Sequence, residues 1–240
     1  MELVSERELL AAASRGVAAS GYVIGTAGNL SLRVDDRVVV TPTGGVLADL
    51  TAEMMVVVDM DGNVVDGELA PTSELPLHLS VYRATGAGAV AHAHALASTA
   101  VSCSCTELPA IHYTILELGG AIRVAPYATF GSEELAANVT AALEGRVAAL
   151  MQNHGSVTHG RDITEACNRL TTVEWHAELY ARSLALGTPR IMTDAELEGV
   201  VMAAINMKYG LRKAANGESA DPAGSAGSAG SAGSGSGGEG

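Results

Sequence analysis

Two histidines separated by one residue are the feature of the chain most suggestive of chemistry. His92 and His94 lie in a short apolar run, each flanked by alanines. Side chains alternate between the two faces of a strand, so these imidazoles would project on the same side, close enough to share one metal ion. Neutral imidazole is a common ligand of divalent transition metals. The spacing therefore favours a metal site.

A third histidine and one carboxylate extend this ligand set. His154 follows an apolar, strand-like run and precedes a glycine, and such strand ends often display ligand-binding groups. Glu74 falls in the predicted first turn of a helix, behind Thr72 and Ser73. Three imidazoles and one carboxylate match a tetrahedral zinc site. His78, one helical turn after Glu74, is either a fifth candidate or a hydrogen-bond partner of the ligands.

The remaining histidines have ordinary interpretations. His112 is expected in a loop, His159 in an exposed turn and His176 on the surface of a long helix. Two other metal-dependent folds fit poorly. A metallo-β-lactamase-like hydrolase needs Asp and His directly after its histidine pair, where Ala95-Leu-Ala-Ser98 stands here. An amidohydrolase barrel needs its pair on the first strand and a longer chain.

The elements that would position these residues alternate between helices and strands. A Ser5/Glu8 capping box opens a helix that runs to about residue 20. Hairpins are expected at 29–34 with 37–41 and at 55–59 with 63–65, and single strands at 87–94, 123–125 and 147–152. Further helices are expected at 74–84, 96–105, from 132, at 163–186 and at 194–211. This order predicts an α/β sandwich with a mixed or antiparallel sheet.

Composition narrows the classes of function. With 14 basic and 27 acidic residues the formal net charge is −13, which argues against nucleic-acid or anionic-membrane partners. The sequence contains no apolar run long enough to span a bilayer and no signal-peptide pattern. Three cysteines, an odd number, suit a reducing cytoplasm. Residues 1–213 are expected to form one domain, and 214–240 a flexible Gly/Ala/Ser-rich tail.

Eight short segments, in order, resemble the class II aldolase/epimerase family, and within it the L-fuculose-phosphate aldolase branch. They are Thr26-Ala-Gly-Asn-Leu-Ser31, Thr41-Pro-Thr-Gly44, Thr72-Ser-Glu74, His92-Ala-His94, Ile111-His-Tyr113, Ala125-Pro-Tyr-Ala-Thr-Phe-Gly131, Gln152-Asn-His-Gly155 and Lys208-Tyr-Gly-Leu-Arg212. Thr72 stands where the family usually has Ser. The resemblance implies a three-layer α/β sandwich whose central mixed or antiparallel sheet is covered by helices.

The resemblance also implies the reaction and its residues. A ketose 1-phosphate such as L-fuculose 1-phosphate would be cleaved reversibly to dihydroxyacetone phosphate and a small aldehyde such as L-lactaldehyde. Zn²⁺ would be held by Glu74, His92, His94 and His154, with Glu74 also acting as the base. The phosphate pocket would comprise Gly28, Asn29, Thr43, Gly44, Thr72 and Ser73. Glycine turns, hydroxyls and a helix N-terminus can bind a phosphate despite the negative net charge.

Aromatic residues complete the implied site. Tyr113 would act on the aldehyde oxygen, and in the resembling enzymes this tyrosine comes from the adjacent subunit of a homotetramer. Phe130 and Tyr209 match positions near the aldehyde half of the substrate. The alternatives are a sugar-phosphate 4-epimerase or dehydratase of the same family, or a non-catalytic scaffold of the same fold. The epimerases characteristically have Asp where this chain has Glu74, and the scaffold lacks the metal ligands.

The composition of the tail yields a stability prediction. Deleting everything after Arg212 should leave the melting temperature nearly unchanged, because the removed segment has little apolar surface to bury. Differential scanning calorimetry of the two proteins is the measurement, and a large drop would refute the prediction. A second truncation that also removes Tyr209 serves as the comparison, and it should reduce turnover.

Overall fold

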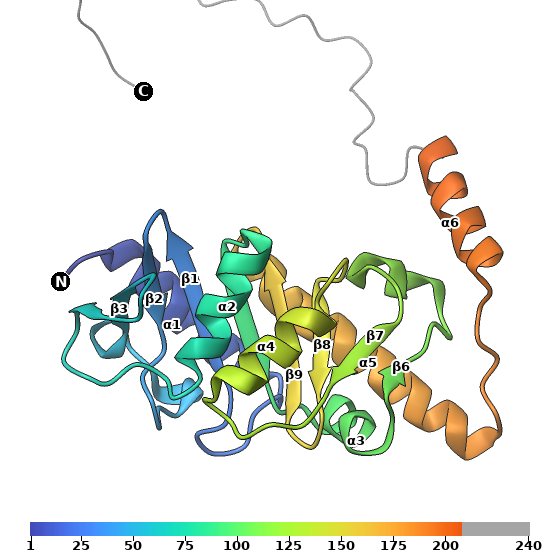
Figure 1. Cartoon of the computed structure of the whole chain (residues 1–240), viewed down its shortest axis with the longest axis horizontal. Coiled ribbons are helices and arrows are strands. Elements are labelled where there is room, and N and C mark those ends of the chain that lie inside the picture. Colours follow the sequence, from blue (N-terminus) through green and yellow to red (C-terminus); the bar gives the residue numbers. More distant parts are fainter. Residues whose placement is uncertain (208–240) are drawn as a thin grey trace, which may run out of the picture. The chain divides into compact units, whose positions relative to one another are not determined.

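The structure, a computed structural model, describes residues 1–207 (Figure 1). Residues Met1–Val201 form one compact unit, and a second unit begins at Met202. Tyr209, the predicted end of the last helix and the predicted domain boundary at 213/214 lie outside the described residues. Within those residues, no helix combines the length and hydrophobicity needed to cross a membrane.

A nine-stranded sheet forms the centre of the first unit. Its strands are β1 (Asn29–Val34), β2 (Arg37–Val40), β3 (Val56–Asp59), β4 (Val64–Asp66), β5 (Ala89–Ala93), β6 (Glu107–Leu108), β7 (Ile122–Ala125), β8 (Ala148–Met151) and β9 (Gly155–Gly160). They lie in the order β4-β3-β2-β1-β5-β9-β8-β7-β6. All paired neighbours are antiparallel except β7 and β8, which are parallel. The predicted mixed sheet is confirmed.

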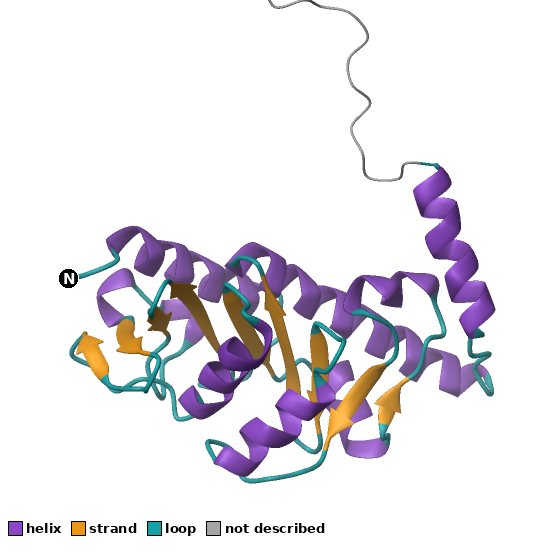
Figure 2. Ribbon diagram, turned by 45° about the horizontal axis from the view of Figure 1, so that its top comes forward, coloured by secondary structure: helices purple, strands orange, loops and turns teal. Residues whose placement is uncertain are grey.

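Helices cover both faces of this sheet (Figure 2). The α-helices are α1 (Val4–Ala19), α2 (Leu75–Thr85), α3 (Leu96–Ser104), α4 (Glu133–Ala142), α5 (Ile163–Leu186) and α6 (Asp194–Asn206), and short 3₁₀ helices are η1 (Leu47–Asp49), η2 (Ala52–Met54) and η3 (Tyr113–Leu118). One apolar core lies between the sheet and α2 with α4. Two others lie on the opposite face, against α1 and α5 and around α3, η3 and α5. The expected three-layer α/β sandwich is confirmed.

Strand periodicity assigns the side chains to these cores. Val38 and Val40 of β2 pack toward α2, whereas Val39 between them packs toward α1. On β5, Val90 packs toward α2 and Ala91 toward α1. Since side chains alternate, His92 shares its face with Val90 and points toward the α2 side of the sheet.

Helix starts were predicted with mixed success. The Ser5/Glu8 capping box is wrong: α1 begins at Val4, so Ser5 lies inside the helix and its hydroxyl bonds the Glu6 carboxylate. Ser132 caps α4 as expected, accepting a hydrogen bond from the Leu135 N–H. At α6, Thr193 and Glu196 form a capping box, with both reciprocal bonds present.

The sequence analysis did not predict strand β9. The predicted locations of two histidines were also wrong, because both are packed against other parts of the fold. His159 is not in an exposed turn but on β9, half-buried, where its Nε2 donates to the Arg146 carbonyl. His176 is not on the helix surface. It is fully buried on the face of α5 that packs against η3, and its Nε2 hydrogen-bonds the Thr114 hydroxyl. Neither residue lies with the predicted ligands.

Candidate metal centre

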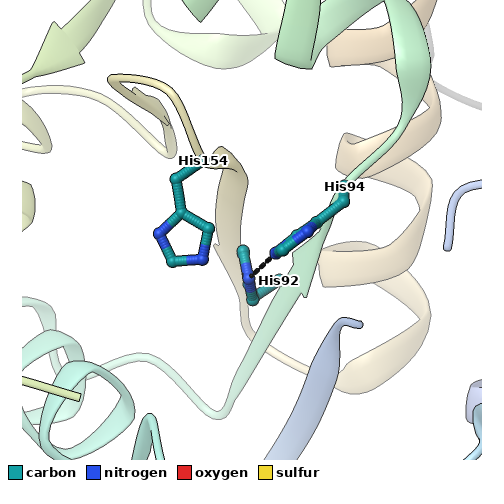
Figure 3. A group of neighbouring side chains, drawn as sticks. All are labelled: His92, His94 and His154. Atoms are coloured by element: carbon teal, nitrogen blue, oxygen red, sulfur yellow. Dashed lines mark hydrogen bonds between the residues drawn. The ribbon is translucent and has the colours of Figure 1, made fainter. Parts of the chain in front are cut away.

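The three predicted histidine ligands come from two neighbouring strands. His92 lies on β5 and His94 directly follows it, while His154 lies in the tight turn between β8 and β9. The antiparallel pairing of β5 with β9 places Ala93 opposite Ser156. The turn that carries His154 therefore lies beside the end of β5, and the three rings point toward one another (Figure 3).

The imidazoles form a nearly equilateral triangle. Their ring centroids are 4.8 Å apart for His92 and His94, 4.9 Å for His92 and His154, and 4.8 Å for His94 and His154. One ligand nitrogen from each ring lies within 4.8 Å of the other two. The His92 and His94 Nε2 atoms are 2.9 Å apart. This spacing lets all three nitrogens approach a single ion.

A backbone carbonyl fixes the orientation of His92. Its Nδ1 lies 2.9 Å from the carbonyl oxygen of Ser156 on β9. A carbonyl can only accept, so Nδ1 carries the proton and donates it. In the neutral ring Nε2 is then left with its lone pair directed at the other histidines. Metal-binding histidines are commonly held by such a bond from the second ring nitrogen.

Glu74 joins the cluster from the opposite layer. It is the residue that caps α2, and only 5% of its surface is exposed. Its Oε2 lies 3.1 Å from His92 Nε2 and accepts a hydrogen bond from the Asn29 side-chain amide at 2.8 Å. Its Oε1 lies 3.4 Å from His154 Nε2 but makes no hydrogen bond, although it is buried.

Charge and burial set the protonation states of the cluster. Burial raises the pKa of the Glu74 carboxyl, but His92, His154 and the Asn29 hydrogen bond outweigh it and hold that pKa far below its ordinary value. Burial lowers the pKa of His92, and the adjacent Glu74 carboxylate more than reverses the effect. Burial, reinforced by the nearby His92, lowers the pKa of His94 to about 3 and that of His154 to about 4.

These groups fit a divalent metal ion. Lone pairs on several nitrogens and a carboxylate oxygen face one another in a buried space, which is unfavourable unless a cation or proton lies between them. The unbonded Glu74 Oε1 is a buried acceptor that a cation would satisfy. Three imidazoles and one carboxylate are donors that zinc and similar metals accept.

Two glycines permit the close packing around the centre. A side chain at Gly155 would place its Cβ 2.4 Å from the Ala93 carbonyl oxygen and 3.0 Å from the His94 ring. Gly28 has a φ of 83°, and a Cβ there would lie 3.1 Å from the His92 carbonyl oxygen. Larger residues at either position would push the backbone away from the histidines.

An open pocket of about 280 Å³ adjoins three of the four predicted ligands. All the residues predicted for phosphate binding line it, together with Phe130: Gly28, Asn29, Thr43, Gly44, Thr72 and Ser73. Glu74, His94 and His154 line the same pocket. The structure thus brings the predicted phosphate residues and three of the four predicted ligands to one cavity.

Tyr113 is not among the residues that line this pocket. It lies on η3, is 49% exposed and stacks on the His112 ring with centroids 4.5 Å apart. Sequence reasoning missed Tyr127 and Asn153 as lining residues of the pocket. Both stand inside the quoted motifs, and the φ of 54° at Asn153 marks the turn that presents His154.

Comparison with known proteins decides the family. Residues 8–181 match the family described as the Class II Aldolase and Adducin N-terminal domain. The chain belongs to this family. An expectation of a metal-dependent aldehyde-lyase is confirmed at that level, because the similar proteins are named as aldolases. The three-histidine cluster gives the chain a candidate metal site of its own.

Individual relatives differ in the substrate they are named for. An L-fuculose phosphate aldolase from Escherichia coli (strain K12) is 41% identical over 191 residues, covering 78% of this chain and 87% of that protein. A 5-deoxy-D-ribulose 1-phosphate aldolase from Bacillus thuringiensis is 32% identical, covering 83% and 95%. A 3-oxo-tetronate 4-phosphate decarboxylase from Haemophilus influenzae is 35% identical, covering 81% and 95%.

A solved structure of an L-fuculose 1-phosphate aldolase superposes with a TM-score of 0.80. It is 34% identical, and the superposition covers 85% of this chain and 97% of that one. The fold is therefore that of this family of enzymes.

The geometry predicts the effect of removing one ligand. His92→Ala should abolish stoichiometric metal binding, because His92 is a fully buried corner of the triangle and its loss removes one of three nitrogens. Metal content after dialysis, measured by plasma mass spectrometry, tests this. His159→Ala, which removes a half-buried histidine outside the cluster, is the control and should keep its metal. Unchanged metal content in His92→Ala would contradict the assignment.

Proposed function

We propose that the chain catalyses the reversible, zinc-dependent cleavage of a ketose 1-phosphate to dihydroxyacetone phosphate and a small aldehyde. The observation that carries the proposal is the convergence of Glu74, His92, His94 and His154 beside a pocket rich in anion-binding groups. Membership of the class II aldolase family and similarity to L-fuculose phosphate aldolases support it.

Binding of the phosphate would use the pocket residues named above. Thr72 and Ser73 precede α2, whose N-terminus carries a partial positive charge. Thr43 and Gly44 line the same cavity, and Gly44 adopts a φ of 67°. Hydroxyls and backbone N–H groups at such positions can hold a phosphate dianion without a nearby lysine or arginine.

Zinc would be held by the three imidazoles and Glu74. When bound, the ion would act as a Lewis acid on the substrate oxygens beside the bond that breaks. During cleavage the hydroxyl on the aldehyde half loses its proton as its carbonyl forms, the carbon–carbon bond breaks, and the electron pair stays on the dihydroxyacetone phosphate half, where that carbon takes up a proton. In the reverse direction a base removes the same proton.

Glu74 is the proposed base. Its carboxylate can accept a proton, and it lines the pocket beside the proposed phosphate residues. Its Oε1 is free of hydrogen bonds. The glutamate also weighs against a 4-epimerase, where an aspartate is characteristic. The four converging ligands weigh against a non-catalytic scaffold.

In the condensation direction the aldehyde oxygen must gain a proton. We assign the hydroxyl that supplies it to Tyr113 of a partner subunit. In its own chain Tyr113 is exposed and does not line the pocket. A homotetramer in which each site borrows this tyrosine would account for an exposed aromatic side chain in a protein with only 3% aromatic residues. Phe130, 64% exposed at the pocket, is assigned to the aldehyde half of the substrate. Tyr209 keeps the same assignment as a prediction.

The place of action is proposed to be the cytoplasm. All three cysteines, Cys103, Cys105 and Cys167, are unpaired in the structure, which suits a reducing compartment. The strongly acidic chain weighs against a nucleic-acid or anionic-membrane partner.

The proposal is tested by synthesis. The zinc-loaded protein is incubated with dihydroxyacetone phosphate and a panel of aldehydes that includes lactaldehyde and glycolaldehyde, and NMR identifies the products and their stereochemistry. Formation of ketose 1-phosphates supports the proposal and names the aldehyde. Absence of any condensation product, together with decarboxylation of a 3-oxo acid phosphate, would favour the decarboxylase instead.

The role of Glu74 is tested with Glu74→Gln. This variant should keep part of its metal affinity but lose about 10²–10⁴-fold in exchange of the carbon-bound proton of dihydroxyacetone phosphate, because an amide cannot accept that proton. Deuterium incorporation followed by NMR measures the rate. Glu165→Gln, a carboxylate bonded to Arg161 and Arg169 outside the site, is the control. Wild-type exchange in Glu74→Gln would remove it from this role.

The shared site is tested by mixing inactive variants. Tyr113→Phe and His92→Ala should each be strongly impaired alone. Refolding or co-expressing them together should restore activity, because some sites then combine an intact histidine cluster with Tyr113 of the partner subunit. If Tyr113 acted within its own chain, no mixed assembly would contain a complete site, and activity would stay lost.

A further inference from the structure

A row of buried polar side chains leads from Glu74 into the layer between β1 and α2. The Asn29 amide donates to Glu74 Oε2 at 2.8 Å, and the Asn29 Oδ1 lies 2.5 Å from His78 Nε2. The Ser31 hydroxyl lies 2.6 Å from His78 Nδ1 and 2.6 Å from the Tyr82 hydroxyl. His78 and Ser31 are fully buried, and Tyr82 and Asn29 are 1% and 6% exposed.

The two elements bring these residues together by their periodicities. Asn29 and Ser31 are two residues apart on β1 and so share the face that packs against α2. Glu74, His78 and Tyr82 are spaced four residues apart, which places them along one face of α2 and its cap. Each of the three side chains from α2 therefore hydrogen-bonds at least one of the two side chains from β1.

The direction of the hydrogen bonds follows from what each atom can do. Asn29 Oδ1 can only accept, so His78 Nε2 must donate to it, and the Asn29 amide group is thereby turned toward Glu74. Complete burial lowers the pKa of His78 to about 3, which keeps the ring neutral. Its Nδ1 then accepts from Ser31, and Ser31 accepts from Tyr82.

The result is an unequal pair of oxygens on Glu74. Oε2 is bonded by Asn29 and lies beside His92, whereas Oε1 has no hydrogen bond. If the Asn29 side chain turned over, its oxygen would face the carboxylate and its nitrogen would face a donor. His78 opposes this turn, because its Nε2–H accepts no hydrogen.

We propose that His78, supported by Ser31 and Tyr82, is a positioning residue that locks the Asn29 amide and so keeps one oxygen of Glu74 bonded and the other free. The inference rests on the proposed function of Glu74 as the base. It assigns a catalytic consequence to a polar cluster that would otherwise only satisfy its own hydrogen bonds inside the protein.

A matched pair of substitutions tests the assignment. In His78→Gln the new amide nitrogen lies about as far from the backbone as Nε2 and can still donate to Asn29. In His78→Asn the amide reaches only as far as Nδ1. The asparagine variant should lose about 10–100-fold in kcat, with a smaller change in KM, and the glutamine variant should retain most of it. Ser80→Ala, whose hydroxyl on the same helix bonds Thr140, is the control and should keep its kcat.

A second readout needs no activity. In metal-free protein with ¹⁵N-labelled histidine and asparagine, NMR should show His78 as the neutral Nε2–H tautomer. It should also show an Asn29 amide proton shifted by its bond to a carboxylate, and this shift should disappear in His78→Asn. A Nδ1–H tautomer for His78 would overturn the proposal, and this holds even if both variants fail to fold.

The outcomes separate this inference from the proposed function. Equal kcat values in His78→Asn and His78→Gln, with the Asn29 signal unchanged, would show that the cluster is only structural while the aldolase assignment stands. The aldolase assignment would be wrong if the wild-type protein neither exchanged the carbon-bound proton of dihydroxyacetone phosphate nor condensed that compound with an aldehyde. The tautomer and the Asn29 signal would still decide whether His78 fixes the amide.

Discussion

The fold holds three imidazole nitrogens and one carboxylate, all of which donate electron pairs, close to one another in a buried space. The Nε2 atoms of His92 and His94 lie 2.9 Å apart, and a Glu74 oxygen lies 3.1 Å from the same His92 atom. In water these groups would separate. Within the fold they stay together because the strands and the helix that carry them are fixed by extensive burial, and a cation is the partner that makes the arrangement favourable.

The sheet and the helical layer above it both contribute residues to this cluster. The β5 strand supplies His92, its antiparallel partner β9 supplies the Ser156 carbonyl that orients the ring, and the β8–β9 turn supplies His154. From across the core, α2 supplies Glu74, and β1 supplies the Asn29 amide that binds it. The proposed substrate pocket is lined by Glu74, His94 and His154. In the proposed function, substrate binding, metal ligation and proton transfer would therefore share one small set of backbone positions.

Much of this was accessible from sequence because it rests on local periodicity. The His-x-His spacing on a strand predicted a shared face for His92 and His94, and the helix pattern placed Glu74 at the start of α2. Strand β9 was missed, since its four central residues between two glycines carry a weak signal. His176 was misplaced because its burial comes from η3, which packs on α5 from far away in the sequence. Long-range packing of this kind leaves no periodic trace.

The choice of substrate is a separate question from the metal site. Proteins similar to this chain are named as a fuculose-phosphate aldolase, a deoxyribulose-phosphate aldolase and a decarboxylase, and one fold can host several reactions. Exposed aromatic residues such as Phe130 and Tyr127 border the open side of the pocket, where the variable half of a substrate would lie.

The most direct test of the account is to remove the metal exhaustively with a chelator and measure carbon–carbon bond cleavage before and after restoring zinc. The account predicts one metal ion per chain, loss of cleavage in the stripped protein and recovery on adding zinc. Full activity in protein shown to be free of metal would contradict it.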